Sequence, residues 1–447
     1  MDIQTILKDV TDDKRMKVAV TDIDGILRGK FLHPAKFHSV LEGGFGFCDV
    51  VLGWDMADTC YDNVSLTGWH SGYPDAHVRL DPTTFRRIPW NNDLPFVLGE
   101  FVLPDGEPHP VCPRQLLKSV RRYAESLGYT AHFGMEFEWF NFLETPTSLH
   151  EKGFRDMKPL TPGMFGYSML RTSLNDEIYE QLMAQLESFG VPLEGLHTET
   201  GPGVLEAALM NTEALEAADR AVLFKSATKE ILYRHGVVPT FMAKWNAELP
   251  GSSGHMHQSL WKDGVNAFYD ESDPLKMSDT FRHYLAGQIA LLPEILPMFA
   301  PTVNSFKRLV EGMWAPTRVT WGADNRTVAL RVIPGSAKST RLETRVGGAD
   351  LNPYLGIAAA LAAGLYGIEN KLPLDTERVV GNGYEAEAIR LPSSLDAAAK
   401  AMSASDRSRT LFGSNFVDHF VNTRLWEQRQ YAAAVTDWEL ARYFELV

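Results

Sequence analysis

The chain has 447 residues, of which 45% are hydrophobic, and a formal net charge of −14 at pH 7. This composition supports a large buried core and argues against intrinsic disorder. The negative charge argues against a general nucleic-acid or anionic-membrane binder, although it is compatible with an anionic substrate held by local arginines.

The cysteines and the apolar segments bear on the compartment. Three widely spaced cysteines make neither a disulfide framework nor a zinc site, which suits a reducing environment. The N-terminus has no signal-peptide core, so we expect a cytoplasmic protein. The longest apolar run, residues 354–368, is too short for a membrane span and predicts a buried helix, so no membrane partner is expected.

The predicted elements of the first hundred residues are short. Residues 2–16 predict an amphipathic helix, and residues 17–32 predict a β-hairpin that turns at Asp24-Gly25. Residues 43–62 predict a packed acidic loop, and several strands follow up to Leu103. The segment 104–110, rich in proline, then predicts a linker.

Longer helices alternate with strands after the linker. Helices are predicted at residues 113–127, 174–189, 212–236 and 277–297, and strands at 132–142 and 237–245. Residues 304–332 predict a strand–loop–strand unit, and an Ala-rich helix is predicted from Asn352 onward. The C-terminus beyond about residue 395 is predicted to be helical.

Two glutamates share one face of the strand predicted at 132–142. Residues two apart in a strand point to the same side, so Glu136 and Glu138 lie together, with Phe137 and Trp139 on the opposite side. Burying two carboxylates without compensation is costly, and a divalent cation between them removes that cost. The alternative is an exposed strand face with two solvated acids.

Two further segments carry similar chemistry. Glu199 and Glu206 flank a Gly-Pro-Gly turn that lets both carboxylates approach one centre. His255 and His257 share a strand face after a glycine-rich entry, although a satisfied core histidine explains either residue alone equally well. Magnesium prefers oxygen ligands, manganese also accepts imidazole, and the absence of a thiol partner argues against zinc.

Cationic residues gather further along the chain. Arg341, Glu343 and Arg345 alternate, which places two cations and a carboxylate on one strand face. Arginine holds carboxylate and phosphate groups through paired hydrogen bonds, and the alternative is a solvated basic face. No Walker loop or dinucleotide fingerprint is present, so a nucleotide site must be built from side chains.

Together these segments resemble the glutamine synthetase family. The matching motifs follow the family's order over nearly the whole chain, at residues 134–139, 199–206, 251–260, 304–309, 324–327, 341–345 and 352–355. The resemblance implies an α+β fold with a small N-terminal β-grasp domain, residues 1–105, and a large catalytic domain, residues 106–447, in which helices flank a curved antiparallel sheet. It also implies a homododecamer of two hexameric rings with active sites between subunits.

The resemblance assigns roles to individual residues. It implies two or three Mg²⁺ or Mn²⁺ ions per site. The ion nearer glutamate is held by Glu138, Glu199 and Glu206. The ion nearer the phosphates is held by Glu136, His255 and Glu343. Positions that bind glutamate are Arg308, Arg345 and Gly251, and Arg326 matches the arginine that stabilises the transferring phosphoryl group. Positions on the nucleotide side are His257, Ser259, Arg331, Lys338 and Arg341.

The implied reaction has two steps. The γ-carboxylate of L-glutamate attacks ATP while the ions and Arg326 offset the charge, which gives γ-glutamyl phosphate. An amine then attacks this acyl phosphate and yields a γ-glutamyl amide, ADP and phosphate, and water must be excluded meanwhile.

One departure from the family pattern concerns the acceptor. Ammonia-using members carry a glutamate six residues after the arginine that matches Arg308, and this chain carries Trp314 there. An indole removes charge and adds apolar surface worth about 1–3 kcal/mol to a buried alkyl or aryl group. We therefore predict an organic primary amine as acceptor, as in the γ-glutamylputrescine and γ-glutamyl-alkylamide synthetases of amine catabolism. The alternative is that Trp314 only packs the closed flap loop.

Other assignments around the acceptor are looser. The family's neighbouring loop with an ammonium-binding aspartate is absent; Asp49 is its nearest equivalent, and the choice between Asp49 and Asp55 stays open. Tyr167 is a candidate lining residue, and Pro250 replaces a usual asparagine. A polyamine would need an acidic wall, whereas Trp314 favours a monoamine or arylamine. The competing functions are an ammonia-using glutamine synthetase and a non-catalytic structural ring, and the second predicts lost ion ligands, whereas all six are present.

Overall fold

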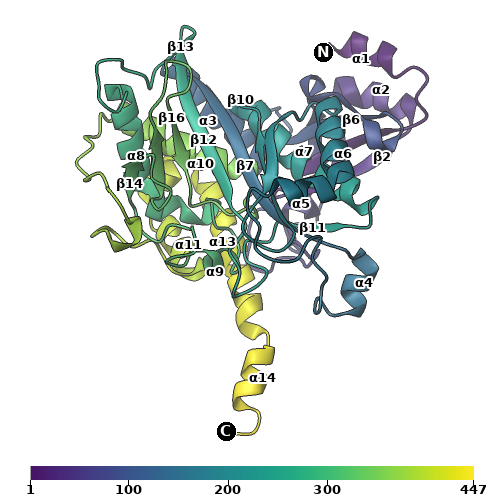
Figure 1. Cartoon of the computed structure of the whole chain (residues 1–447). Coiled ribbons are helices and arrows are strands. Elements are labelled where there is room, and N and C mark those ends of the chain that lie inside the picture. The colour runs from purple at the N-terminus through teal and green to yellow at the C-terminus, as the bar shows by residue number, and fades with distance from the viewer. Residues whose placement is uncertain (1) are drawn as a thin grey trace.

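The computed structural model describes residues 2–447 and has an α+β fold built on two sheets (Figure 1). The smaller, six-stranded sheet has the strand order β2-β1-β6-β4-β3, with β5 paired to β6. Its strands are β1 (Met16–Thr21), β2 (Leu27–Leu32), β3 (Phe45–Cys48), β4 (Asp75–Leu80), β5 (Arg86–Ile88) and β6 (Leu94–Val102). The first two form the predicted hairpin, and only the β1–β6 pair is parallel.

The larger sheet has ten strands in the main order β14-β15-β16-β12-β7-β9-β8. They are β7 (Thr130–Phe142), β8 (Leu193–Thr198), β9 (Val204–Leu209), β10 (Thr212–Glu213), β11 (Val238–Thr240), β12 (Gly254–Lys262), β13 (Val265–Asn266), β14 (Trp321–Ala323), β15 (Leu330–Ile333) and β16 (Arg341–Thr344). The expected antiparallel sheet is present, except that β14 and β15 run parallel.

Long helices pack behind the larger sheet. They are α3 (Pro113–Ser126), α7 (Ala214–Tyr233), α8 (Asp279–Ile295) and α10 (Pro353–Glu369). The Ala-rich α10 is almost wholly buried, as its apolar run predicts, and α8 lies against it at a point where a Cβ on Gly287 would come within 2.1 Å of the Ala363 carbonyl oxygen. Among residues 2–447 no helix is long and apolar enough to cross a membrane.

Strand β7 separates the apolar core from the polar face of the sheet. Phe133, Phe137 and Trp139 are buried against α7 and its neighbours, whereas Glu136 and Glu138 point to the other side. Because side chains alternate along a strand, the packing on one face fixes the direction of the carboxylates on the other.

Buried charges join elements from both parts of the chain. Arg114 of α3 donates two hydrogen bonds of 2.9 Å to Asp219 of α7 and one of 2.6 Å to Glu100 of β6. Residues of β1 and β6 also pack into the same core as β7 and α3. The two predicted domains are therefore in intimate contact, and their division at residue 105 stays a prediction.

Some elements differ in extent from the sequence expectations. The first helix, α1 (Ile3–Asp9), is shorter than predicted because the chain turns after Val10, where the Asp13 amide donates a 3.1 Å hydrogen bond to the Val10 carbonyl. Where residues 304–332 predict an initial strand, the chain forms α9 (Ser305–Arg308), since the Ser305 hydroxyl donates to Asp350 at 2.6 Å and fixes a helical turn.

The region between β7 and β8 and the strand after α7 also differ. Two short helices without a clear sequence signal, α4 (Pro146–Glu151) and α5 (Met169–Leu174), precede the predicted α6 (Asp176–Ser188). The predicted strand at 237–245 is reduced to β11, because Lys244 leaves the sheet and its backbone exchanges two 2.8 Å hydrogen bonds with the Asn304 side chain.

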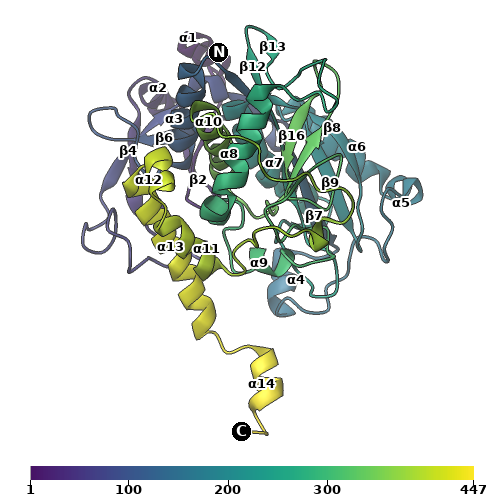
Figure 2. The ribbon, with the colours of Figure 1, turned by 90° about the vertical axis from the view of Figure 1, so that its left-hand side faces the viewer.

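The C-terminal region is helical, as predicted. It comprises α11 (Leu395–Ser403), α12 (Asp406–Phe412), α13 (Ser414–Ala433) and α14 (Asp437–Tyr443). The last of these helices projects away from the body of the protein (Figures 1 and 2). The remaining helix, α2 (Pro34–Gly43), covers the small sheet.

Candidate functional site

One group of ligand side chains lies where β7, β12 and β16 run side by side. The pairing of β12 with β7 sets His255 opposite Glu136, and Glu343 lies on β16 at the other edge of β12. Nδ1 of His255 is 3.5 Å from a carboxylate oxygen of Glu136 and 3.4 Å from one of Glu343. Three side chains far apart in the sequence therefore converge on one point, and we name them the first ligand group.

Neighbouring cationic side chains keep Glu343 of the first ligand group ionised. Glu343 is 1% exposed, and Nη1 of Arg331 lies 2.8 Å from it while Arg345 forms a second ion pair. Burial would raise the pKa of Glu343, but His255 and Arg345 outweigh it and hold the pKa at about 2. Nε2 of His255 is buried and has no hydrogen-bond partner among the described residues.

A second ligand group lies at the turn between β8 and β9. Nε2 of His197 is 3.3 Å from Glu199 and 3.9 Å from Glu206, and Glu206 faces Glu138 across the β7–β9 pair. Burial, and then the carboxylates of Glu138, Glu136 and Glu199, raise the pKa of Glu206 to about 10.

The donor sets fit divalent cations. Like charges crowded in a buried site disfavour ionisation, and an ion bound by oxygen and nitrogen donors removes that repulsion. Nδ1 of the buried His255 lies beside the carboxylates of Glu136 and Glu343, and this set of nitrogen and oxygen donors suits a divalent ion such as Mn²⁺.

Both ligand groups line one cavity of about 630 Å³. All six side chains assigned to ions from the sequence contribute to its wall. Its other lining residues are Tyr167, His197, Thr200, Val204, Pro250, Gly251, Ser253, Met313, Trp314, Arg326, Arg331 and Arg345. The cavity is therefore anionic at its floor and carries both cationic and apolar side chains around it.

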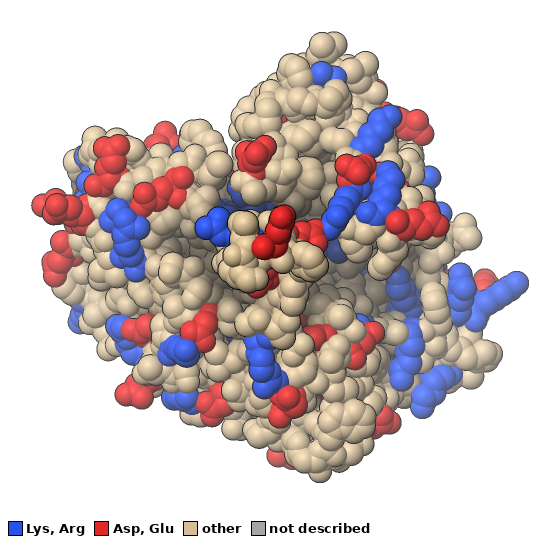
Figure 3. All heavy atoms as spheres, turned by 90° about the horizontal axis from the view of Figure 1, so that it is seen from below, with Lys and Arg blue, Asp and Glu red and all other residues tan. Residues whose placement is uncertain are grey.

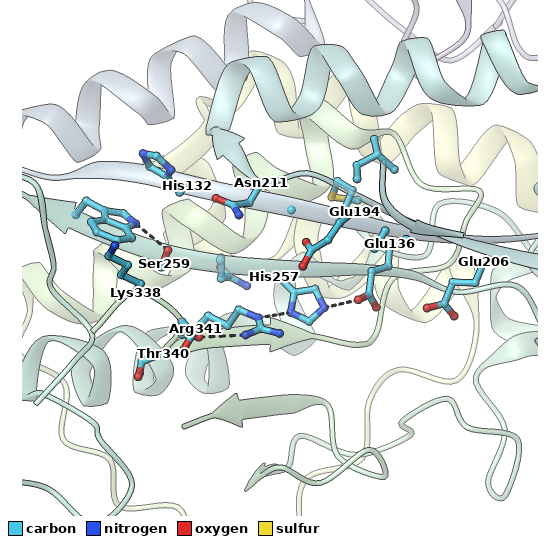
Figure 4. Close-up of a pocket in the computed structure, with 18 of the residues that line it drawn as sticks. His132, Glu136, Glu194, Glu206, Asn211, His257, Ser259, Lys338, Thr340 and Arg341 are labelled. Atoms are coloured by element: carbon cyan, nitrogen blue, oxygen red, sulfur yellow. Dashed lines mark hydrogen bonds and ion pairs between the residues drawn. The ribbon is translucent and has the colours of Figure 1, made fainter. Parts of the chain in front are cut away.

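A second cavity of about 370 Å³ adjoins the first and shares Glu136, His197 and Glu206 with it. It extends along β12 toward Ser259 and the segment from Lys338 to Arg341 (Figure 4). Four of the five residues assigned to the nucleotide side line this cavity, namely His257, Ser259, Lys338 and Arg341, whereas Arg331 lines the first one.

A line of hydrogen-bonding groups joins the two cavities. Nε of Arg341 donates to Nδ1 of His257 at 3.0 Å, and Nε2 of His257 lies 2.9 Å from Glu136 (Figure 4). Because Nδ1 accepts a hydrogen bond, the proton of a neutral His257 is on Nε2 and faces the carboxylate.

Trp314 lies in the loop between α9 and β14 and contributes to the wall of the first cavity. It has a left-handed backbone, with φ of +60°, and its side chain is 57% exposed. The loop is held by Glu311, which lies 3.5 Å from Arg318 and 3.3 Å from Arg390. A large apolar side chain in a strained conformation is thus presented beside the ion ligands.

The glutamate-binding assignments occupy two different environments. Arg345 and Gly251 line the first cavity, as does Arg326 of the phosphoryl assignment, and a Cβ on Gly251 would come within 2.5 Å of the Ala243 carbonyl oxygen, so only glycine fits. Arg308 is 2% exposed and donates to the Val346 carbonyl at 3.1 Å and to the Ser253 hydroxyl at 2.9 Å. In this conformation its guanidinium is engaged beneath the cavity wall.

Asp49 lies in the region of the small sheet and does not line either cavity of its own chain within residues 2–447. One of its carboxylate oxygens is buried without a partner, and burial raises its pKa. Asp55 instead accepts hydrogen bonds from the Trp426 indole and from two backbone amides. A role for Asp49 in a neighbouring subunit stays a prediction.

His197 and Glu194 are ionisable lining residues that the sequence did not single out. His197 stands two positions before Glu199, so the same alternation that paired the other ligands could have found it. Glu194 lines the second cavity, but an irregular pairing between Leu193 and Gly195 breaks the alternation and hides it.

The outer surface differs from the cavity. Acidic and basic side chains are interspersed on the face of the molecule seen from below (Figure 3). The concentrated groups of ionisable residues lie inside the cavities, which points to a small charged ligand at that place.

Residues 110–443 match the model of the glutamine synthetase catalytic domain. Similar proteins over 438 residues include type-1 glutamine synthetase 2 from Dictyostelium discoideum, at 54% identity with 97% of this chain and 84% of the relative covered. Glutamate–isopropylamine ligase from a Pseudomonas species is 37% identical, with 97% and 95% covered. The γ-glutamylethanolamide synthetase GlnA4 from Streptomyces coelicolor is 38% identical over 430 residues, with 96% and 92% covered.

A solved structure has the same fold. The GmaS–ADP complex superposes with a TM-score of 0.86 at 27% identity and covers 99% of both chains. The α+β architecture, the curved sheet and the flanking helices are therefore confirmed. The chain belongs to the glutamine synthetase family.

Proposed function

We propose that this protein is an ATP-dependent ligase that joins the γ-carboxylate of L-glutamate to an organic primary amine. The observation that carries the proposal is Trp314 in the wall of the cavity that also holds both ligand groups. The family pattern has a carboxylate at this position in ammonia-using enzymes. Two relatives that cover nearly the whole chain are named for ligation of isopropylamine and for synthesis of γ-glutamylethanolamide, which supports the same conclusion.

The proposed chemistry is transfer of the γ-phosphoryl group of ATP to glutamate, followed by attack of the amine on γ-glutamyl phosphate. Divalent ions, when bound, supply charge neutralisation for the phosphate and carboxylate oxygens. Arg326 and Arg345 reach the cavity as cations that orient anionic groups through paired hydrogen bonds. We propose that Arg326 stabilises the transferring phosphoryl group and that Arg345 binds glutamate.

The smaller cavity suits the nucleotide. His257, Ser259, Lys338 and Arg341 are proposed to bind ATP there, and Arg331 to face its phosphates from the first cavity. The two cavities meet at Glu136, so a phosphate chain can run from one to the other and bring the γ-phosphate beside the first ligand group. Gly251 leaves room for the glutamate backbone, and Arg308 becomes a glutamate ligand only if its buried hydrogen bonds are exchanged.

The walls near Trp314 favour a compact apolar amine. Met313, Val204 and Pro250 add apolar surface there, and Tyr167 adds an aromatic ring. The carboxylate of Glu199 lies in the same wall and is suited to an ammonium group, whose proton must leave before attack. We therefore favour an alkylamine or arylamine over a polyamine.

The assembly and ion content are also proposals. A homododecamer of two hexameric rings would bring Asp49 of one subunit to the amine site of the next. Two or three Mg²⁺ or Mn²⁺ ions per site match the two ligand groups. We further propose that the protein acts in the cytoplasm, where it would use glutamate and ATP.

An ammonia-using glutamine synthetase is the competing function. It is favoured by the 54% identity to a relative named as type-1 glutamine synthetase 2. Phosphate release with ATP, glutamate and a panel of methylamine, ethylamine, isopropylamine, ethanolamine, benzylamine, putrescine and ammonia separates the two. We expect the highest kcat/KM with a monoamine. Turnover of ammonia equal to or better than that of every amine would reject the proposal.

A further inference from the structure

His197 is the one imidazole that borders both cavities and lies within the second ligand group. The sequence assigned this group only the carboxylates of Glu138, Glu199 and Glu206. In the structure, however, the ligand atoms that converge within 4.8 Å of one another belong to His197, Glu199 and Glu206. Glu138 has one oxygen engaged, since it accepts a 2.7 Å hydrogen bond from the Ser253 backbone amide.

The spacing of this set matches that of the first ligand group. Nε2 of His197 lies 3.3 and 3.9 Å from its two carboxylates, and Nδ1 of His255 lies 3.4 and 3.5 Å from its own two. Adjacent ligands of an octahedral ion with bonds of about 2.0–2.1 Å lie about 2.9 Å apart. Each set therefore needs only a small contraction to close around an ion.

Tyr167 restrains the ring of His197. It stacks on Tyr167 with ring centroids 4.6 Å apart and an angle of 11° between the planes. The Tyr167 backbone amide in turn donates a 2.7 Å hydrogen bond to the Thr198 carbonyl, next to His197 in the strand. This stacking restrains the plane of the imidazole, and Nε2 lies on the side of Glu199 and Glu206.

We propose that His197 is a ligand of the ion nearer glutamate, bound through Nε2 beside Glu199 and Glu206, and that Tyr167 positions its ring. Each ion then has one imidazole, His255 at one and His197 at the other. An imidazole at both ions favours Mn²⁺ over Mg²⁺, because Mg²⁺ prefers a shell of oxygens. This inference rests on the proposed use of divalent ions and does not depend on which amine is the acceptor.

The test counts nitrogen ligands on bound Mn²⁺ in the full-length protein labelled with ¹⁵N-histidine. Electron spin-echo and electron–nuclear double resonance spectra report each imidazole directly bound to manganese. With two Mn²⁺ equivalents per site we expect one bound imidazole on each ion. H255Q should remove one signal and H197Q the other, and H197Q should weaken the affinity of one Mn²⁺ by at least about tenfold.

Control variants separate coordination from general damage. H235Q changes a histidine that lines neither cavity and lies 3.9 Å from Glu177, and it should keep both nitrogen signals. Y167L removes the ring that stacks on His197 and should weaken the affinity of the ion beside Glu199 and Glu206. The nitrogen signal of His255 should stay, and at most that of His197 should be lost. Unlabelled H197Q that still binds one Mn²⁺ with a nitrogen signal demonstrates that the variant is folded.

The outcomes also distinguish this inference from the proposed function. If wild-type protein carries a single manganese-bound imidazole and only H255Q removes it, His197 is not a ligand, whereas the ion-dependent reaction stands. If no bound imidazole is found at either ion, both the inference and the assigned first ligand group are overturned.

Discussion

Replacing Trp314 by glutamate tests the proposed acceptor most directly. The side chain is 57% exposed beside the cavity, and a tryptophan presents about 250 Å², so about 140 Å² of it is open to a ligand. An alkyl group that covers half of this area removes about 70 Å² of indole from water, which is worth about 1.8 kcal/mol. That energy corresponds to roughly a twentyfold preference for an alkylamine over ammonia in kcat/KM.

W314E should therefore lower kcat/KM for the best alkylamine by about twentyfold and raise it for ammonia, which gains a carboxylate partner. The left-handed backbone is strained for both residues, so the comparison isolates the side chain. The assay is phosphate release at saturating ATP and glutamate with each amine varied. W314F should keep the amine preference.

A matched control places the same charge elsewhere on this loop. Val310 is 37% exposed and lines neither cavity, so V310E should leave the amine-to-ammonia ratio unchanged. A ratio that changes by less than about threefold in W314E, against the twentyfold derived from the exposed area, would refute the reasoning. Trp314 would then serve only to pack the loop.

Three further predictions concern ions, buried charge and pH. Mn²⁺ at about a hundred times its Kd should stabilise the protein by about 2.7 kcal/mol for each bound ion in thermal unfolding, and E199Q combined with E206Q should lose the share of the ion at the second ligand group. R114M leaves the buried carboxylate of Asp219 without its cation, although the Tyr354 hydroxyl still donates to it, and urea unfolding should reveal a loss of about 3–5 kcal/mol. Burial lowers the pKa of His419 to about 4, so the folded state binds fewer protons than the unfolded state between pH 4 and 6.5. Stability should fall as the pH drops through that window, by up to about 3 kcal/mol in urea titrations.

Contrary results are equally clear for these three. An E199Q/E206Q double variant with an undiminished Mn²⁺ response would place the ion elsewhere. An R114M variant with wild-type stability would mean that the buried network is replaced without cost. A variant H419Q with the same acid sensitivity as wild type would assign the pH dependence to other groups.

Much of the fold follows from local signals. The hairpin at residues 17–32, the alternation of β7 and the apolar run of α10 each specify one element, because the buried face leaves a single arrangement. The ligands on β7, β12 and β16 could be predicted to share faces for the same reason. Their convergence in space depends on strand order, which no single segment encodes, and the family resemblance supplied it.

Other features depend on long-range contacts. The direction of the Arg308 side chain follows from carbonyl oxygens at Val346 and Arg345, which lie almost forty positions away in the sequence. The left-handed backbone of Trp314 is set by a loop whose anchors include Arg390. His197, by contrast, follows from the alternation rule, since it stands two positions before Glu199.

The arrangement of β7 has a consequence for protein engineering. One face of this strand belongs to the core and the other to the ligand groups, so a mutation that shifts the strand disturbs folding and phosphate chemistry together. The loop that carries Trp314 contains no strand and lies between α9 and β14. A library for new acceptors should therefore randomise residues 310–316 and leave the sheet untouched, since selectivity can diversify there while the chemical step keeps its scaffold.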